Sequence, residues 1–338
     1  MTGMLDLLAT GYPSLDYICQ VSHSPAVGET AIVRTPPSRY TFGGCGANVA
    51  VGLARLGFRV GVAMVVGDDA PGRDYIAYLQ RERVDIRDVI RWPDFGTSES
   101  RLYVNPDGEY QNFFYAGAAD AWQGKLTLAS LADARYALLT VGALHYNRQF
   151  VQLVLGAGIP LIWQLKPDVY AYPPGALTDL TRSSVLLMMN RIEADYLIRS
   201  LGVSSAADLL SDKTRLVVVT LGADGSRIFN ETGVYEVPAV PPKQLIDPTG
   251  AGDAFTAGFL ASWLQGRPPV VCGQIGSVVA SFVLEKVGCQ TNLPDWERLS
   301  ARYTERFGKA NQLRKRCPEP CPERSRKIKE LSKERPND

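Results

Sequence analysis

The sequence predicts an α/β fold: a doubly wound, mostly parallel sheet flanked by helices, with a small β-sheet lid. Three observations support this fold. Short apolar runs typical of buried strands recur along the chain, amphipathic helical patterns separate them, and two stretches instead alternate apolar and polar residues. Regular strand–helix alternation favours a parallel sheet covered on both faces. The two alternating stretches favour a second, antiparallel sheet.

The predicted strands are apolar on both faces, as expected for strands buried between two helical layers. They read LDLLATG (5–11), VGVAMVVG (60–67), YALLTVG (136–142), PLIWQL (160–165), SVLLMMN (184–190) and LVVVTLG (216–222). The predicted helices have apolar residues at three- and four-residue spacing and span 48–57, 73–83, 147–158 and 191–202.

The chain divides into one α/β domain over residues 1–310 and a tail over 311–338. The lid is expected from about 12–42 and 97–116, where Pro106-Asp107-Gly108 is a hairpin signal. The tail is charged, punctuated by proline and poor in apolar residues, a composition typical of disorder.

Composition excludes several functional classes. The formal net charge of +1 indicates neither a nucleic-acid nor a membrane partner. The first residues lack the basic start of a secretory signal, and the six cysteines are scattered, so we expect a cytoplasmic protein with reduced thiols. Only two histidines are present, His23 and His145, which leaves little basis for a metal cluster or a Ser-His-Asp triad.

The stretch DPTGAGDAFTAGFLASWL (247–264) places glycines and Asp253 at the start of an apolar helical run. Free N–H groups and the helix dipole make such a start a suitable phosphate site. A carboxylate there would repel phosphate unless it has a task such as taking a proton from an attacking hydroxyl. The alternative is that Asp253 only caps the helix. The stretch is neither a Walker A loop nor a dinucleotide fingerprint.

Residues 41–57, TFGGCGANVAVGLARLG, place a glycine cluster and Asn48 at the start of another helix. Small residues allow a ligand to approach the backbone, and the Asn48 amide can both donate to and accept from hydroxyls. A purely structural turn would have the same pattern.

Two further segments are equally open to two interpretations. Asn190 and Glu193 form an N-x-x-E pattern, which predicts either a helical capping box or a pair facing Mg²⁺–phosphate, with Glu193 acting through water. Thr220, Gly222 and Gly225 lie in a strand–turn–strand pattern and predict either a nucleotide-binding turn or a plain hairpin.

Taken together, the order and separation of these four segments resemble the ribokinase, or PfkB-type, family of sugar and nucleoside kinases. The resemblance runs from about residue 5 to 307. Its members transfer the γ-phosphoryl group of ATP to a primary alcohol, and their ribokinase-like fold is a doubly wound α/β core with a small β lid. This implies an enzyme that uses ATP and Mg²⁺.

The resemblance also implies roles for individual residues. Asp253 matches the base, and the N–H groups of Gly250, Ala251 and Gly252 match the anion hole for the moving phosphoryl group. The residues that match the family's acceptor-binding positions are Asp16, Gly43, Gly44 and Asn48. Those that match its Mg-ATP and nucleotide positions are Asn190, Glu193, Thr220, Gly222 and Gly225. Asp247 and Thr249 lie where many members hold a monovalent cation such as K⁺.

One departure concerns the strand at 160–165, where many members have an aspartate and this chain has Gln164, with Lys166 close by. A carboxylate contribution from that strand is therefore not expected.

The acceptor is less well defined by the sequence. Asp16 and Asn48 suit vicinal hydroxyls, and the aromatic residues of 101–122 can stack on a base, so a nucleoside is favoured, adenosine first. A sugar such as ribose or fructose is the alternative, and a non-catalytic binding protein of the same fold is a third reading. Both monomers and homodimers occur in the family.

Overall fold

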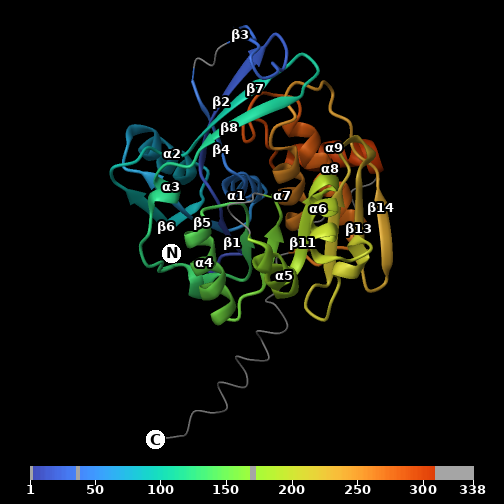
Figure 1. The fold of residues 1–338 in the computed structure, drawn as a ribbon. Coiled ribbons are helices and arrows are strands. Elements are labelled where there is room, and N and C mark those ends of the chain that lie inside the picture. Colours follow the sequence, from blue (N-terminus) through green and yellow to red (C-terminus); the bar gives the residue numbers. More distant parts are fainter. Residues whose placement is uncertain (1–2, 36–38, 168–172, 309–338) are drawn as a thin grey trace, which may run out of the picture.

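The larger of two sheets runs through the middle of the molecule (Figure 1). The computed structural model describes residues 3–35, 39–167 and 173–308, and the predicted tail 311–338 lies outside them. The sheet has nine strands in the order β14-β13-β12-β11-β10-β9-β1-β5-β6. In this order, the strands from β12 through β11, β10, β9, β1 and β5 to β6 are parallel to their neighbours. Strand β13 pairs antiparallel with both β12 and β14. Their bounds are β1 (Leu7–Thr10), β5 (Val60–Gly67), β6 (Asp85–Trp92), β9 (Ala137–Leu139), β10 (Leu161–Gln164), β11 (Ser184–Asn190), β12 (Leu216–Thr220), β13 (Ser226–Asn230) and β14 (Gly233–Val237).

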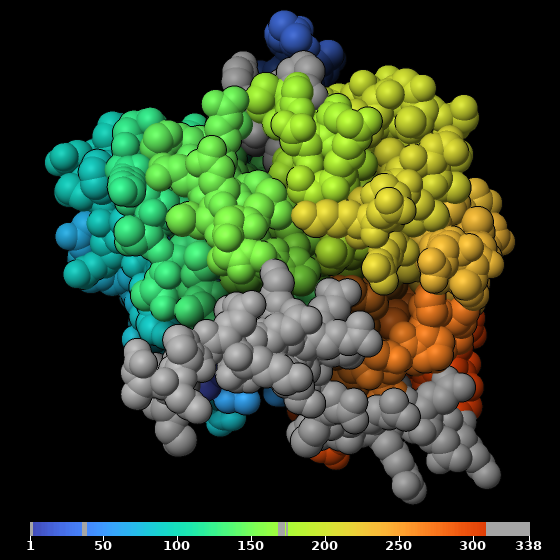
Figure 2. Space-filling view, turned by 90° about the horizontal axis from the view of Figure 1, so that it is seen from below, coloured from blue at the N-terminus to red at the C-terminus, as the bar shows by residue number. Residues whose placement is uncertain are grey.

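Helices cover both faces of this sheet, so the predicted fold class is confirmed. One face packs against α1 (Cys45–Arg55), α2 (Ala70–Arg81), α7 (Ala251–Trp263), α8 (Pro269–Val283) and α9 (Trp296–Phe307). The other packs against α3 (Ala118–Ala121), α4 (Leu144–Gly156), α5 (Pro174–Ser183) and α6 (Arg191–Leu201). Seen from below, the green to yellow segments with α4 to α6 lie on one side and the orange and red ones on the other (Figure 2).

Alternation of side chains explains why the strands are apolar throughout. In β11, Leu186 and Met188 pack on the α7–α8 side, and Leu187 and Met189 pack on the α4–α6 side. Successive side chains of a strand point to opposite faces, so a strand between two helical layers needs apolar residues at every position.

A smaller, five-stranded sheet stands above the larger one (Figure 1). It contains β2 (Ser14–Val21), β3 (Val33–Thr35), β4 (Thr41–Gly43), β7 (Glu99–Val104) and β8 (Tyr110–Tyr115). The order is β3-β2-β7-β8, with β4 also paired to β2. The β7–β8 hairpin is antiparallel, and its turn includes the predicted Pro106-Asp107-Gly108.

The chain passes between the two sheets at four places, which we call the waist, and each crossing contains a glycine. They are Gly11 before β2, Gly44 after β4, Gly96 before β7 and Gly117 after β8. A Cβ on Gly44 would overlap the Tyr12 carbonyl, and one on Gly117 would overlap the Gly96 carbonyl. The crossings therefore touch in two pairs.

The order of the strands also places a crevice beneath the smaller sheet. From β1 the chain adds β5 and β6 on one side, and it later adds β9 and β10 on the other. Ligands of open α/β sheets bind outside the carboxyl ends of the strands at such a switch point.

Helices α1 and α7 approach each other closely on one face of the sheet. A Cβ on Gly52 of α1 would lie 2.6 Å from the Cβ of Ala257 in α7. Gly52 is thus required by packing and sets the separation of the two helices.

Gly52→Val should destabilise the fold by about 1–3 kcal/mol, because its side chain would force α1 and α7 apart. Urea unfolding measures this free energy. Gly156→Ala at the end of α4, where an added Cβ meets nothing within 4 Å, is the matched control and should be neutral or slightly stabilising. Equal stability of the two variants would show that the α1–α7 contact can relax freely.

Candidate active site

A pocket of about 200 Å³ lies between the smaller sheet and the carboxyl edge of the larger one. Tyr12, Val141 and Lys166, which follow β1, β9 and β10, line its base. The first residues of α1 and α7 line it as well, with side chains of β2, β7 and β8 above. The pocket therefore occupies the switch point.

Asp253 lies in the first turn of α7 but does not cap it. The N-cap residue is Gly250, in the left-handed region with φ 79°, and no side chain caps the helix. The Asp253 carboxylate is 7% exposed and accepts hydrogen bonds from Asn48 Nδ2 at 2.7 Å and Gln164 Nε2 at 2.6 Å. Gln290 Nε2 donates to Asn48 Oδ1 at 2.7 Å and orients that amide. Asp253 is thus held by two amides and faces the pocket.

The start of α7 is open in the way an anion site requires. A Cβ added to Gly252 would meet nothing within 4 Å. Within the described ranges, no acceptor is recorded for the Gly252 or Asp253 N–H, whereas the Ala251 N–H donates to the Pro248 carbonyl at 3.3 Å. Free N–H groups at a helix start bind anions. Of the predicted anion-hole donors, Ala251 is already partnered and Gly252 is available.

Asp16 lines the other side of the pocket, on β2 of the smaller sheet. It is 5% exposed; the Ser14 hydroxyl donates to Oδ1, and the Cys289 thiol donates to Oδ2 at 3.6 Å. Burial raises the pKa of Asp16 to about 6, although both hydrogen bonds act in the opposite direction. A Cβ on Gly43 would overlap this carboxylate, so the glycine makes room for it.

Asn190 and Glu193 form the capping box that the N-x-x-E pattern predicts. The Glu193 N–H donates to Asn190 Oδ1 at 2.9 Å, and the Asn190 N–H donates to Glu193 Oε2 at 2.7 Å. Glu193 Oε1 has no hydrogen bond to the described residues, so it is available to a metal-bound water. Burial raises the pKa of Glu193 to about 7. The capping interpretation is therefore correct, and it does not exclude the metal role.

Thr220, Gly222 and Gly225 form the turn between β12 and β13, a hairpin as the simpler interpretation predicts. Asn190 pairs with Thr220 across β11 and β12, so the two sequence patterns adjoin. A Cβ on Gly225 would overlap the Val237 carbonyl, whereas one on Gly222 would meet nothing within 4 Å. Gly225 has a packing role, and Gly222 leaves open space.

Asp247 holds the loop before α7 in place. It accepts from the Thr249 N–H and the Gly288 N–H, each at 2.9 Å. The Thr249 hydroxyl is buried and has no hydrogen-bond partner. An oxygen left without a partner beside a buried carboxylate fits a cation such as K⁺.

Sequence reasoning missed the roles of Gln164, Lys166 and Gln290. Gln164 ends the central strand β10 and Lys166 follows it, so the carboxyl end of that strand was the available signal. Gln290 lies in a loop with no local signal. Of the aromatic residues in 101–122, Tyr110 and Phe114 line the pocket. Trp122 is buried against Tyr146 instead.

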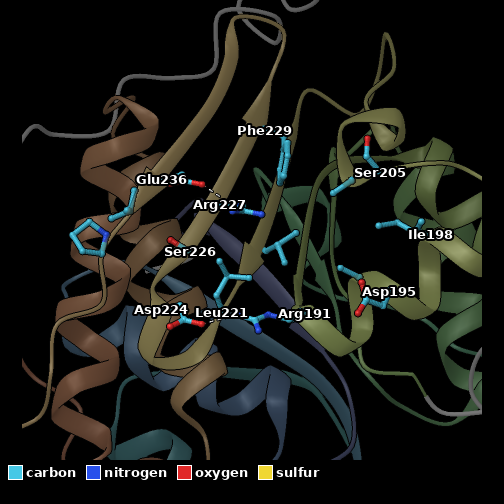
Figure 3. A pocket seen from close by; sticks show the side chains of 15 residues that line it. Arg191, Asp195, Ile198, Ser205, Leu221, Asp224, Ser226, Arg227, Phe229 and Glu236 are labelled. Atoms are coloured by element: carbon cyan, nitrogen blue, oxygen red, sulfur yellow. Dashed lines mark hydrogen bonds and ion pairs between the residues drawn. The ribbon is translucent and has the colours of Figure 1, made fainter.

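A larger groove of about 930 Å³ lies elsewhere (Figure 3). It runs between α6 and the β13–β14 hairpin, with the Arg191–Asp224 ion pair at one end. Its residues Val219 and Phe229 belong to the α4–α6 side of the sheet, opposite α7 and Asp253. The groove shares no lining residue with the pocket around Asp253, although its Leu221 and Asp224 belong to the β12–β13 turn that also contains Gly222.

Comparison with known proteins agrees with this geometry. The family model described as pfkB family carbohydrate kinase matches residues 5–296. The chain belongs to this family. It is accordingly an ATP-dependent phosphotransferase with an alcohol group as acceptor.

Several members of the pfkB family are similar over nearly their whole length. The nucleoside kinase of Methanothermobacter thermautotrophicus is 32% identical, covering 90% of this chain and 97% of that protein. The crystal structure of Methanocaldococcus jannaschii nucleoside kinase matches with TM-score 0.78 and 27% identity, covering 90% and 99%. The nucleoside kinase of Burkholderia thailandensis in complex with inosine has TM-score 0.80 at 22% identity, covering 90% and 98%. Among the described residues, no helix is long and apolar enough to cross a membrane.

The raised pKa of Asp16 predicts a pH dependence of stability. Between pH 4 and 6 the folded protein binds a proton at Asp16 that the unfolded chain does not, so stability falls as pH rises through this window. A shift of about two pKa units corresponds to about 3 kcal/mol. Urea unfolding of the wild type and Asp16→Asn between pH 4 and 7.5 tests this.

The wild type should lose this stability relative to Asp16→Asn as pH rises, because the variant cannot ionise at position 16. Parallel pH curves for the two proteins would contradict a raised pKa at Asp16.

Proposed function

We propose that the protein transfers the γ-phosphoryl group of ATP to the primary hydroxyl of a nucleoside, with adenosine as the first candidate. One observation carries the proposal: Asp253, beside the open start of α7, shares a pocket with the buried carboxylate of Asp16. The related proteins named nucleoside kinase support the substrate class.

Asp253 would act as the base. The proton of the acceptor hydroxyl passes to the Asp253 carboxylate while the hydroxyl oxygen bonds to the γ-phosphorus. The bond to the bridging oxygen of ADP breaks, and ADP keeps the electron pair. The N–H groups of Gly252 and Gly250 would stabilise the charge on the phosphoryl oxygens. Asn48 and Gln164 hold the carboxylate in position for this step.

The pocket has both a polar and an aromatic side, which suits a nucleoside. Asp16 and Asn48 would bind the ribose hydroxyls. Side chains on one face of β8 line the opposite wall, including Tyr110 and Phe114, and the Phe114 ring lies 5.0 Å from that of Tyr12. A flat base can stack on these rings, whereas a free sugar has no ring face of that kind to offer them.

A sugar kinase acting on ribose or fructose is the second candidate, because the same carboxylate and amide bind sugar diols and mouse ribokinase is 25% identical. A binding protein without catalysis is disfavoured, since it has no need of a buried carboxylate beside an anion site.

Remaining cofactor positions follow the family pattern. Glu193 would hold Mg²⁺ through water, with Asn190 beside it. Thr220 and Gly222 would contact the nucleotide. Asp247 and the unpartnered Thr249 hydroxyl would bind K⁺, which would neutralise charge next to the start of α7.

Asp253→Asn should lower kcat by about 10²-fold or more, because the amide cannot take the hydroxyl proton. ATP affinity, measured by calorimetry, should change little. Asp16→Ala is the matched control in the same pocket and should raise the acceptor KM far more than the ATP KM. A normal kcat in Asp253→Asn would remove Asp253 from the mechanism.

A coupled ADP-release assay should find the highest kcat/KM with adenosine or another nucleoside, and lower values with ribose and fructose. Addition of K⁺ should raise the rate, and Thr249→Val should lose that response. A preference for ribose or fructose would replace the nucleoside proposal by the sugar one.

A further inference from the structure

Lys166 is a cation that lines the pocket together with residues at the start of α7. The mechanism proposed above gives it no role. It lies two residues beyond β10, whose last residue Gln164 binds Asp253. The side chain is exposed to the pocket, which Thr249, Gly250 and Asp253 also line. Its position therefore adjoins the start of α7.

The ammonium group of Lys166 forms no ion pair with any residue in the described part of the chain. Arg55 and Arg135, by contrast, pair with Glu82 and Asp6. Its electrostatic neighbours are Cys45, Asp253, Tyr110 and Glu193, and together they raise its pKa above the usual value. Burial raises the pKa of Cys45 to about 12, so its thiol is neutral at neutral pH.

The charged residues that line the pocket indicate why an ammonium group is needed there. Among the described lining residues, Asp16 and Asp253 are acidic and Lys166 is the one cation. A triphosphate brought next to Asp253 would meet a carboxylate. Helix amides alone carry only partial charge. A full positive charge in the same pocket, close enough to interact with Asp253, offsets this repulsion.

We propose that Lys166 is a catalytic residue whose ammonium group contacts the terminal phosphoryl group of ATP and stays bound to it during transfer. The inference rests on the proposed function and deepens it. Lys166 stays protonated throughout: the hydroxyl proton goes to Asp253, the new bond forms between the acceptor oxygen and phosphorus, and ADP leaves with the electron pair. The ammonium group then balances charge on the oxygens of the moving group.

Lys166→Gln tests the proposal in two independent measurements on the full chain with Mg²⁺. By calorimetry, ATP affinity should fall about tenfold while ADP affinity stays within about twofold, because only ATP carries the terminal group. In the ADP-release assay, kcat should fall about 10²-fold, the loss typical of one charge-stabilising donor. Lys166→Arg should recover part of both, since it keeps the charge.

Lys213→Gln is the matched control. Lys213 is exposed and precedes β12, at the end of the sheet remote from the pocket, so its loss removes the same charge elsewhere. It should leave both measurements unchanged. Thermal unfolding checks the fold, and Lys166→Gln should melt close to the wild type because Lys166 forms no ion pair with the described residues.

Each outcome decides a separate point. An unchanged ratio of ATP to ADP affinity, an equal loss of both, or a normal kcat in Lys166→Gln overturns the role of Lys166. If the ratio changes but the wild type phosphorylates no nucleoside or sugar, the contact with ATP stands and the proposed function fails. If Asp253→Asn is inactive while Lys166→Gln is normal, the function stands and the Lys166 proposal fails.

Discussion

The candidate active site depends on the close approach of α1 and α7. Because Gly52 has no side chain, the two helices pack closely. The Asn48 amide on α1 can then reach Asp253 on α7, 205 residues away in sequence. Gln164 completes the support from a third element, β10. A carboxylate held from both sides by amides keeps one orientation, which proton transfer to it requires. The chemistry thus rests on helix packing as much as on the carboxylate itself.

The pocket that contains Asp16 and Asp253 is lined by carboxylates and amides, with Lys166 as the one cation among its described lining residues. Such a lining suits a neutral molecule rich in hydroxyl groups, because Asp16 and Asn48 offer acceptors that need not compete with an anionic substrate. The phosphate donor requires the opposite surroundings. The open start of α7 and Lys166 offer such surroundings within the same cavity. One cavity thus offers groups suited to a hydroxyl-rich molecule and groups suited to a phosphate.

Much of the fold was predictable, because strands buried on both faces are apolar throughout and the helices between them are amphipathic. The α5 helix (Pro174–Ser183) was not predicted, since PGALTDLTRS has little apolar periodicity. The pattern at Asn190 and Glu193 shows a different limit. Local sequence correctly predicts the capping box, but the box occupies only one oxygen of Glu193 and leaves its second role undecided. Gln164, Lys166 and Gln290 become neighbours of the site only through the tertiary fold.

The waist constrains how the pocket can open. A lid connected by one or two chain segments could rotate about them. The smaller sheet is instead connected at four crossings, which contact each other in pairs, Gly44 against Tyr12 and Gly117 against Gly96. These contacts favour a tilt of the whole five-stranded sheet over the swing of a single strand or hairpin. Because Asp16 lies in β2, it would move together with the smaller sheet. Such a tilt would carry Asp16 away from Asp253, which belongs to α7 and stays with the larger sheet, so it would separate the two carboxylates that share the pocket.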